Sequence, residues 1–186
     1  MDKIIATILL IVLLIFPSSV HASNEAGASA ALSPQTHEES INEYVGRSIQ
    51  RMVIGEVLNK YHAPLASEVD GFMNACIAHD VDCYLLPSIA GLESSFGKYT
   101  YPESHNPFGW GGGYIMFDTW EDGFMTDAKG LSENYIDHGA DSIESIGPIY
   151  AASPTWAKRV RFFHNEFERV EAEKKVYFHE LALASR

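Results

Sequence analysis

The chain has 186 residues, 46% of them hydrophobic, and a formal net charge of -12 at pH 7. This length and apolar content favour one compact domain with a hydrophobic core and exclude a chain that is disordered throughout. Nucleic acid and anionic membranes are held by clustered Lys and Arg, so a chain this acidic is not expected to bind either through its charge.

The first 22 residues have the pattern of a secretory signal peptide. An apolar run extends from Ile4 to Phe16, and the small residues that signal peptidase prefers end at Ala22. We expect cleavage after Ala22, export to an extracellular, cell-wall or periplasmic location, and no stable membrane anchor in the mature protein. The alternative is an uncleaved anchor, although the run is shorter than the about 20 residues that a membrane span needs.

A mostly α domain is predicted over residues 41–175, after a small, polar stretch at 23–40 that is typical of a flexible linker. Residues 176–186 are expected to be the end of the last helix or a tail. The Gly-rich stretch 106–117 is expected to hold a loop with a small or vestigial β element. Apolar residues at helical spacing predict six helices. The first three cover 41–61, 65–77 behind Pro64, and 82–93 with Asp82 as N-cap. The others cover 119–139 with a Thr119–Asp122 capping box, a short segment within 142–150, and a long segment from Ser153 onward.

The two cysteines, Cys76 and Cys83, bracket a predicted turn in the sequence CIAHDVDC. In an oxidising compartment this pattern favours a short disulfide loop, and the alternative is a pair of buried free thiols. The eight His residues form no HExxH motif and there is no CxxC pair, so neither zinc nor any other metal or cofactor is expected.

Glu93 is an acidic residue near the end of an otherwise apolar helix, in LLPSIAGLESSFGK. An apolar setting disfavours the charged form of a carboxyl group, so Glu93 is a candidate to donate a proton near neutral pH. Protonation of a glycosidic oxygen requires such an acid. The alternative is a Glu at a helix end that simply points into water.

The stretch NPFGWGGG, from Asn106 to Gly113, combines a flat aromatic side chain with a flexible backbone. Trp110 offers a face for a sugar ring, and Gly111 to Gly113 allow close approach of the backbone to a ligand. The alternative is a tight turn with Trp110 folded into the core. Trp120 and Trp156 fall on helical stripes and are expected to be core residues.

Four segments together resemble the glucosaminidase and lytic transglycosylase members of the lysozyme-like superfamily. They are AGLESSFGK, NPFGWGGG, FDTWEDGF and PIYAASPTWAKRV, and the resemblance covers about residues 61 to 167. It implies a lysozyme-like helical domain that binds peptidoglycan glycan strands and cleaves β-1,4 bonds between their amino sugars.

The resemblance also implies roles for individual residues. Glu93 matches the general acid/base, and Ser94 the hydroxyl that usually follows it. The turn that lines the sugar cleft corresponds to Asn106, Phe108 and Gly109, with Trp110 beside it. Tyr150 matches the Tyr that faces the catalytic Glu, although from the residues alone it could equally be a packed aromatic.

The hydrolytic members of that superfamily use a second carboxylate, and its identity here stays open. Glu103 and Asp118 are candidates, whereas Glu121 and Asp122 are better explained as charges in the first turn of a helix. Without a second carboxylate, the N-acetyl group of the substrate can assist a single acid, as in lytic transglycosylases. Three functions therefore remain: an endo-β-N-acetylglucosaminidase, a lytic transglycosylase, and a non-catalytic glycan-binding module.

Overall fold

The computed structural model describes residues 34–185, with side chains from residue 38 onward. The expected signal peptide and residues 23–33 of the expected linker lie outside the described residues. The described part is mostly helical, as predicted. Its elements are α1 (Pro34–Lys60), η1 (Pro64–Ser67), α2 (Val69–Ala78), α3 (Leu85–Ser94), η2 (Trp110–Gly113), α4 (Trp120–Asn134), η3 (Ile136–His138), α5 (Ile143–Tyr150) and α6 (Trp156–Ala184), where η denotes a 3-10 helix.

No strand occurs in residues 34–185, so the prediction of a small β element near the cleft is wrong. The Gly-rich stretch forms turns and the short helix η2 instead. Gly109, Gly111, Gly112 and Gly113 all have a left-handed backbone, with φ between 61° and 86°. Such a run cannot form the extended ladder of a hairpin.

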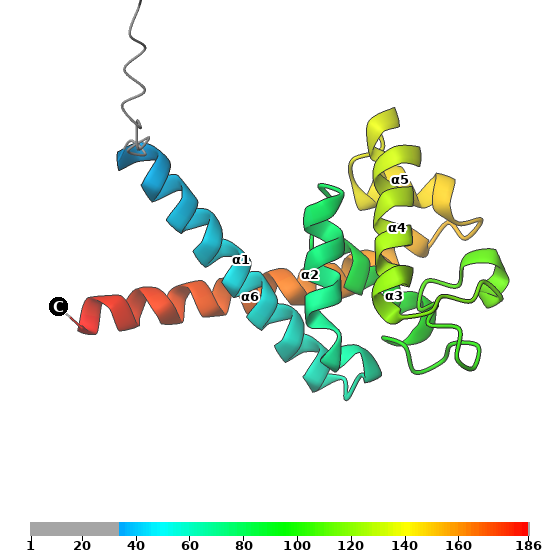
Figure 1. The fold of residues 1–186 in the computed structure, drawn as a ribbon, viewed down its shortest axis with the longest axis horizontal. Coiled ribbons are helices and arrows are strands. Elements are labelled where there is room, and N and C mark those ends of the chain that lie inside the picture. Colours follow the sequence, from blue (N-terminus) through cyan, green and yellow to red (C-terminus); the bar gives the residue numbers. More distant parts are fainter. Residues whose placement is uncertain (1–33, 186) are drawn as a thin grey trace, which may run out of the picture.

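The first and last long helices cross, and their free ends project from the body formed by α2 to α5 (Figure 1). The described part of α1 covers Pro34–Lys60, so residues 34–40 are helical rather than part of the expected linker. At the other end of the chain, α6 continues to Ala184. Of the two structures expected for residues 176–186, a helix end or a tail, residues 176–184 therefore form the helix end.

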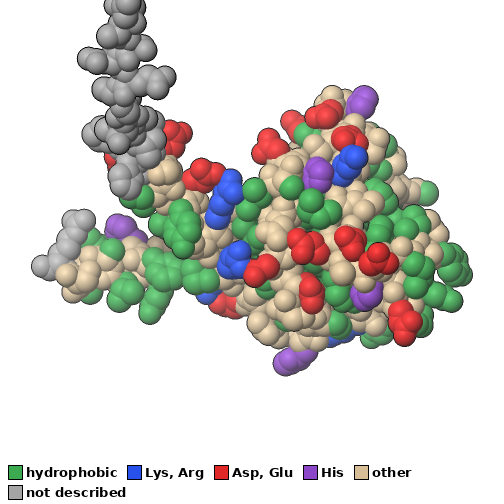
Figure 2. Space-filling view, viewed as in Figure 1, with side chains coloured by type: hydrophobic (Ala, Val, Ile, Leu, Met, Phe, Trp, Pro, Cys, Tyr) green, Lys and Arg blue, Asp and Glu red, His purple; other side chains and the backbone are tan. Residues whose placement is uncertain are grey.

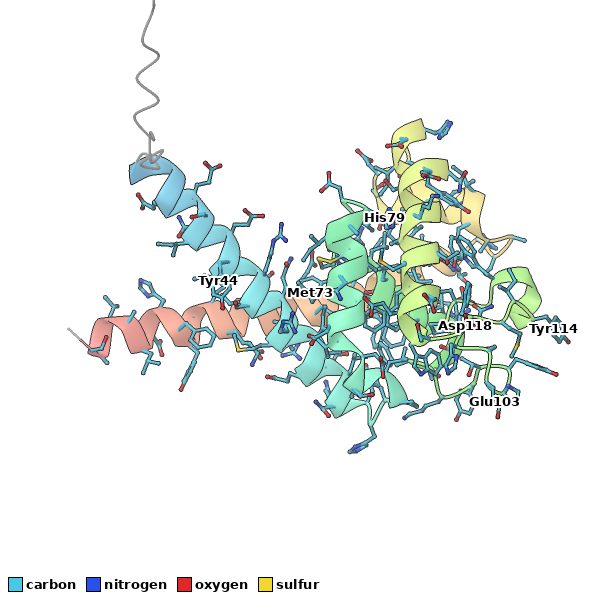
Figure 3. The ribbon with its side chains drawn as sticks, in the orientation of Figure 1. Tyr44, Met73, His79, Glu103, Tyr114 and Asp118 are labelled. Carbon is cyan, nitrogen blue, oxygen red and sulfur yellow. A yellow bond between two sulfur atoms is a disulfide. The ribbon has the colours of Figure 1, made fainter. Side chains whose placement is uncertain are left out.

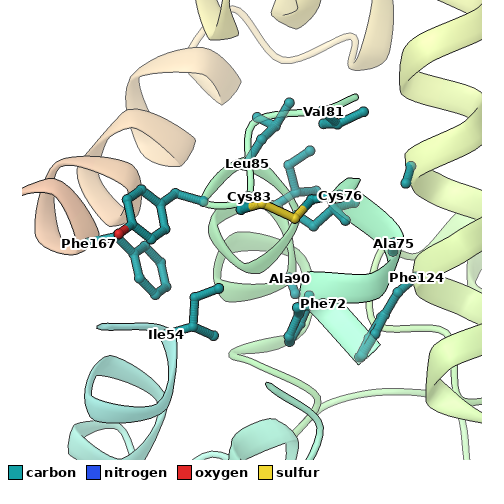
Figure 4. Close-up of a cluster of buried hydrophobic side chains, with 14 of the residues drawn as sticks. Ile54, Phe72, Ala75, Cys76, Val81, Cys83, Leu85, Ala90, Phe124 and Phe167 are labelled. Carbon is teal, nitrogen blue, oxygen red and sulfur yellow. A yellow bond between two sulfur atoms is a disulfide. The ribbon is translucent and has the colours of Figure 1, made fainter. Parts of the chain in front are cut away.

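The helix α3 lies at the centre of the molecule. Its residues Leu85 to Gly91 are all buried, because neighbouring helices cover it on several sides. A helix that is apolar around its whole circumference needs such surroundings. Figure 4 shows the core beside it, where Phe72 of α2 stacks on Phe124 of α4 at a centroid distance of 4.0 Å.

The turn that leads into α3 is held by a disulfide and by a hydrogen bond to a side chain. Cys76 and Cys83 are bonded, with their Cα atoms 5.0 Å apart, which confirms the predicted pair. The prediction of Asp82 as N-cap is wrong, because the helix begins at Leu85 with Tyr84 as its N-cap and without a side-chain cap. Asp82 instead accepts a hydrogen bond of 2.9 Å from the backbone N–H of Tyr84 in the preceding turn. The position of α3 is therefore set at its start.

Two other predicted helix starts have different outcomes. Pro64 begins the 3-10 turn η1, and α2 starts only at Val69, so the prediction of one helix from residue 65 is wrong. The capping box of Thr119 and Asp122 at the start of α4 is confirmed.

The surface combines acidic residues on the body with apolar side chains on the projecting helix ends (Figure 2). The exposed apolar residues on these ends include Tyr44 and Val45 of α1 and Tyr177 and Leu181 of α6. Within residues 34–185, no helix combines the length and the hydrophobicity that crossing a membrane requires.

Candidate active site

Glu93 lies in the last turn of α3, where the helix emerges from the core. Its carboxylate Oε1 accepts a hydrogen bond of 2.7 Å from the indole N–H of Trp156, the first residue of α6. The expected enclosure by apolar side chains is wrong, because Glu93 is exposed while Ile89 and Ala90 are buried one turn earlier. Glu93 is thus an accessible acid with one oxygen held by a buried donor.

Ser94 shapes the chain around Glu93 rather than facing a ligand. It is buried, its hydroxyl donates to the Ala90 carbonyl at 3.1 Å, and it accepts from the Gly97 N–H at 2.9 Å. The next residues, Ser95 and Phe96, have left-handed backbones that reverse the chain. With both hydrogen-bonding capacities of its hydroxyl used internally, Ser94 stabilises the end of α3 and so fixes the orientation of Glu93.

Asn106 organises the Gly-rich loop in the same indirect way. Its side-chain N–H₂ donates to the carbonyls of Trp110 and Ile115, at 2.9 and 3.2 Å, and its Oδ1 accepts from the Trp110 N–H at 3.2 Å. The residue is buried. Because the whole amide group is engaged with the loop backbone, Asn106 holds Trp110 in place instead of contacting a sugar itself.

Trp110 spans the gap between the loop and the helices. A Cβ atom added to Gly130 of α4 would come within 2.3 Å of the Trp110 ring, so the absence of a side chain there makes room for the indole. The ring N–H donates to the Tyr150 hydroxyl at 3.2 Å. Tyr150 in turn stacks on Trp156 at 4.6 Å, which joins the two tryptophans through one tyrosine.

These side chains surround a cavity of about 390 Å³. Its size is within the range of sites for small molecules, about 300–1,000 Å³. Tyr135 forms part of the wall next to Tyr150, at a centroid distance of 6.0 Å. The residues that line the cavity are Glu93, Phe108, Gly109, Trp110, Gly111, Ile115, Tyr135, Tyr150 and Ala151.

A larger cavity of about 730 Å³ lies between α5 and α6 and meets the first at Ala151. The only carboxyl group on its wall belongs to Glu144, whose two oxygens accept hydrogen bonds from Arg161 at 3.0 and 2.6 Å. The smaller cavity is the candidate active site, because an acid that is already paired with Arg161 has no free oxygen to offer a ligand.

A second carboxyl group, that of Asp127 on α4, lies buried near Glu93 and the two tyrosines. Burial raises the pKa of Asp127 well above its usual range, and the negative charge of Glu93 adds to the rise. Burial, followed by the charge of Asp127, likewise raises the pKa of Tyr150, although the hydrogen bond from Trp110 opposes this. The environment thus favours the neutral form of both groups.

The structure brings together most of the residues predicted for the site. Glu93, Phe108, Gly109, Trp110 and Tyr150 line one cavity, and Ser94 and Asn106 support it from behind. The candidate second carboxylates Glu103 and Asp118 are not among the lining residues. Both are exposed, Glu103 on the loop between α3 and α4 and Asp118 just before α4 (Figure 3).

Three residues of the site were not predicted as such: Trp156, Tyr135 and Asp127. Trp156 is a core residue, as predicted, with only 3% of its surface exposed, yet it also binds Glu93. Asp127 carried a detectable signal, because it falls within the apolar stripe formed by Phe124, Ala128 and Leu131. A charged residue in such a stripe points either to a buried partner or to a function.

No group of three or more His, Cys, Asp or Glu residues that could hold a metal ion occurs in residues 34–185. No protein-family model matches the chain, and comparison with curated proteins finds no match either. The function is therefore inferred from the geometry of the site and from the sequence motifs.

Proposed function

We propose that the protein is an exported glycosidase that cleaves β-1,4 bonds between the amino sugars of peptidoglycan, with Glu93 as the general acid/base. The observation that carries this proposal is the hydrogen bond from Trp156 to Glu93 beside an aromatic-walled cavity. Trp156 occupies Oε1, and among the described residues no protein donor is bonded to Oε2. That oxygen is available to a glycosidic oxygen.

The two steps of the reaction use the same carboxyl group. Protonated Glu93 donates its proton to the glycosidic oxygen as the C–O bond breaks, and the Trp156 N–H stabilises the carboxylate that is left. That carboxylate then removes a proton from the incoming nucleophile. Trp110 and Tyr150 supply flat faces against which a sugar ring can stack.

The two candidate enzymes differ in the nucleophile that attacks the sugar. In an endo-β-N-acetylglucosaminidase it is water, and in a lytic transglycosylase it is a hydroxyl of the sugar itself, which leaves an anhydro end. One observation favours the transglycosylase: Glu93 is the only carboxylate on the wall of the 390 Å³ cavity, and a single acid suits a reaction that the N-acetyl group assists.

Digestion of purified peptidoglycan with the wild type and with Glu93→Gln tests the proposal, with the products identified by mass spectrometry. Anhydro ends indicate the transglycosylase, and reducing ends on N-acetylglucosamine indicate the glucosaminidase. Reducing ends on N-acetylmuramic acid would point to a muramidase instead. If the wild type binds glycan but releases no fragments, the proposal is wrong and the protein is a binding module.

The matched control is Glu103→Gln. It removes the same charge from an exposed carboxylate that lies outside the cavity, so its activity is expected to equal that of the wild type. Glu93→Gln is expected to lose about 10²- to 10⁴-fold in rate while it keeps the fold, because a positioned general acid contributes that much.

A further inference from the structure

The cavity of about 730 Å³ between α5 and α6 has no role in the chemistry proposed so far. Its wall is formed by α5, the first two turns of α6 and the loop 151–155 that joins these helices. The volume lies within the range of about 300–1,000 Å³ that ligand sites occupy. The residues that line it are Glu144, Gly147, Pro148, Ala151, Ala152, Ser153, Pro154, Ala157, Lys158 and Arg161.

Contacts between α5 and α6 fix the shape of this cavity. Arg161 of α6 donates hydrogen bonds to both carboxylate oxygens of Glu144 on α5, at 3.0 and 2.6 Å. Gly147 of α5 lies so close to α6 that a Cβ atom added to it would come within 2.9 Å of the Ala157 side chain. The two helices are therefore held at a set separation along the cavity wall.

The wall consists mainly of small side chains. Seven of the ten lining residues are Gly, Ala, Pro or Ser, and none of the ten is aromatic. The smaller cavity differs, because Trp110, Tyr135 and Tyr150 present rings to it. The smaller cavity thus offers flat faces to a sugar, whereas the larger one suits a ligand with small apolar groups such as methyl side chains.

The charges on the wall favour an anionic ligand. Lys158 is exposed, and no carboxylate is paired with it within residues 38–185. The second cation, Arg161, is neutralised by its ion pair with Glu144. Two cations and one carboxylate leave the wall with a charge of +1, on a chain whose formal charge is -12. A carboxylate on the ligand is attracted to this wall, although the protein as a whole repels anions.

The larger cavity is continuous with the candidate active site. Ala151 belongs to the walls of both cavities and directly follows Tyr150. Its backbone is extended, with φ -136° and ψ 142°, and leads from one wall to the other. A substituent on a sugar bound beside Tyr150 can therefore pass over Ala151 into the larger cavity. Peptidoglycan has such a substituent, since its N-acetylmuramic acid carries a short peptide that contains alanine and free carboxylates.

We propose that the larger cavity binds the peptide of peptidoglycan, with its small apolar wall against alanine methyl groups and Lys158 against a peptide carboxylate. The inference rests on the proposed function, because it names the form of peptidoglycan that the enzyme prefers, which is glycan that still carries its peptides. These contacts lie away from the bond that breaks and are the same before and during the reaction. They therefore lower the KM for peptide-bearing strands relative to bare strands.

Cleavage of two matched glycan substrates tests the proposal. Soluble strands are used with their peptides and, from the same material, after an amidase has removed them. The wild-type KM should be about 3- to 10-fold lower for the peptide-bearing strands, and Lys158→Ala should reduce this ratio. Equal KM values for the two substrates in the wild type would overturn the proposal, and so would an unchanged ratio in Lys158→Ala.

A charge control and a steric variant accompany this assay. Lys129→Ala removes an exposed cation of α4 that lines neither cavity, so it should keep the wild-type ratio. Ala152→Phe places a large ring in the larger cavity and should raise the KM for peptide-bearing strands toward that for bare strands. Lys158 and Ala152 are both exposed, so neither replacement disturbs the core. An unchanged ratio in Ala152→Phe would show that the peptide lies elsewhere.

Binding of an isolated peptide separates this inference from the proposed function. The probe is N-acetyl-L-alanyl-D-glutamate, which has one alanine methyl group and two carboxylates, and its uncharged diamide is the control. In an NMR titration of the wild type, amide shifts should change mainly in the loop 151–155 and at the start of α6, and less with the diamide or in Lys158→Ala. A lack of shifts at millimolar dipeptide refutes the inference even if the protein cleaves glycan. A wild type that binds the dipeptide but cleaves no glycan refutes the proposed function alone.

Discussion

Replacement of Trp156 by phenylalanine isolates the contribution of one hydrogen bond to the proposed chemistry. The indole N–H donates to Glu93 Oε1 at 2.7 Å, and phenylalanine removes this donor while it keeps an aromatic ring beside Tyr150. In the proposed reaction Glu93 changes from a neutral acid to a carboxylate, and a donor stabilises the carboxylate more than the acid. Trp156→Phe should therefore slow the chemical step.

The size of the effect follows from the geometry of the pair. Hydrogen bonds to charged groups contribute about 1.5–3 kcal/mol, and the exposure of Glu93 to solvent places this one in the lower half of that range. Since a factor of ten in rate corresponds to about 1.4 kcal/mol, kcat should fall about 10- to 40-fold. The KM should change little, because the donor does not line the cavity.

The assay is steady-state release of fragments from peptidoglycan, with the melting temperature measured alongside. The smaller ring leaves a void in the core, so Tm should fall by a few degrees without loss of the fold. Trp120→Phe is the matched control, because Trp120 is half-buried at the start of α4 and packs on His105 rather than Glu93. A folded Trp156→Phe protein with wild-type kcat would refute the role assigned to this bond.

Three further predictions concern the cavity wall, the disulfide and acid stability. Gly130→Ala puts a methyl group within 2.3 Å of the Trp110 ring, so the indole must move and the KM for glycan should rise. Replacing both cysteines of the Cys76 disulfide by serine should cost about 2 kcal/mol of stability in urea unfolding, since the bridge closes a short loop. Burial opposes ionisation of Asp82, but the hydrogen bonds from His164 and Tyr84 and the charges of His164 and Arg161 together outweigh it and lower the pKa. The ionised Asp82 therefore stabilises the fold above about pH 4 and less as pH falls further.

Each of the three has a control and a contrary result. The control Gly46→Ala, on the exposed part of α1, should raise stability and leave activity unchanged. If Gly130→Ala has the same two effects, the packing of Trp110 against Gly130 is contradicted. The serine double variant is compared with the reduced wild type, and equal stability before and after reduction would contradict the second prediction. Asp82→Asn should flatten the acid limb of the stability curve, and an unchanged limb would show that other carboxyls determine it.

The helices could be predicted because their apolar residues recur with one period and their ends carry recognisable caps. The box at Thr119 and the pair of cysteines are local signals, and the structure contains both. The stretch around Trp110 could not be predicted in the same way. Its shape depends on Asn106. The side-chain amide of Asn106 donates hydrogen bonds to the carbonyls of Trp110 and Ile115, and it can do so only after the chain has turned.

The structure brings several of the predicted site residues together around one cavity, but the prediction that depended on burial was wrong. Glu93 was expected in an apolar enclosure, but the last turn of α3 leaves the core and exposes it. The carboxyl group that is enclosed is that of Asp127. The helical period places Asp127 in the core, but it does not reveal that Asp127 lies near Glu93. Trp156 illustrates the same difficulty, since one buried side chain can serve both packing and a hydrogen bond over a long sequence separation.

The crossing of α1 and α6 also sets the order in which the protein becomes competent. Lys60 and Tyr61, at the end of α1, bond to Glu166 of α6, and the donor to Glu93 is the first residue of that same last helix. During synthesis these contacts can form only after α6 has left the ribosome. Under the proposed function, the glycosidase would therefore stay inactive until α6 docks, which separates translation from attack on glycan.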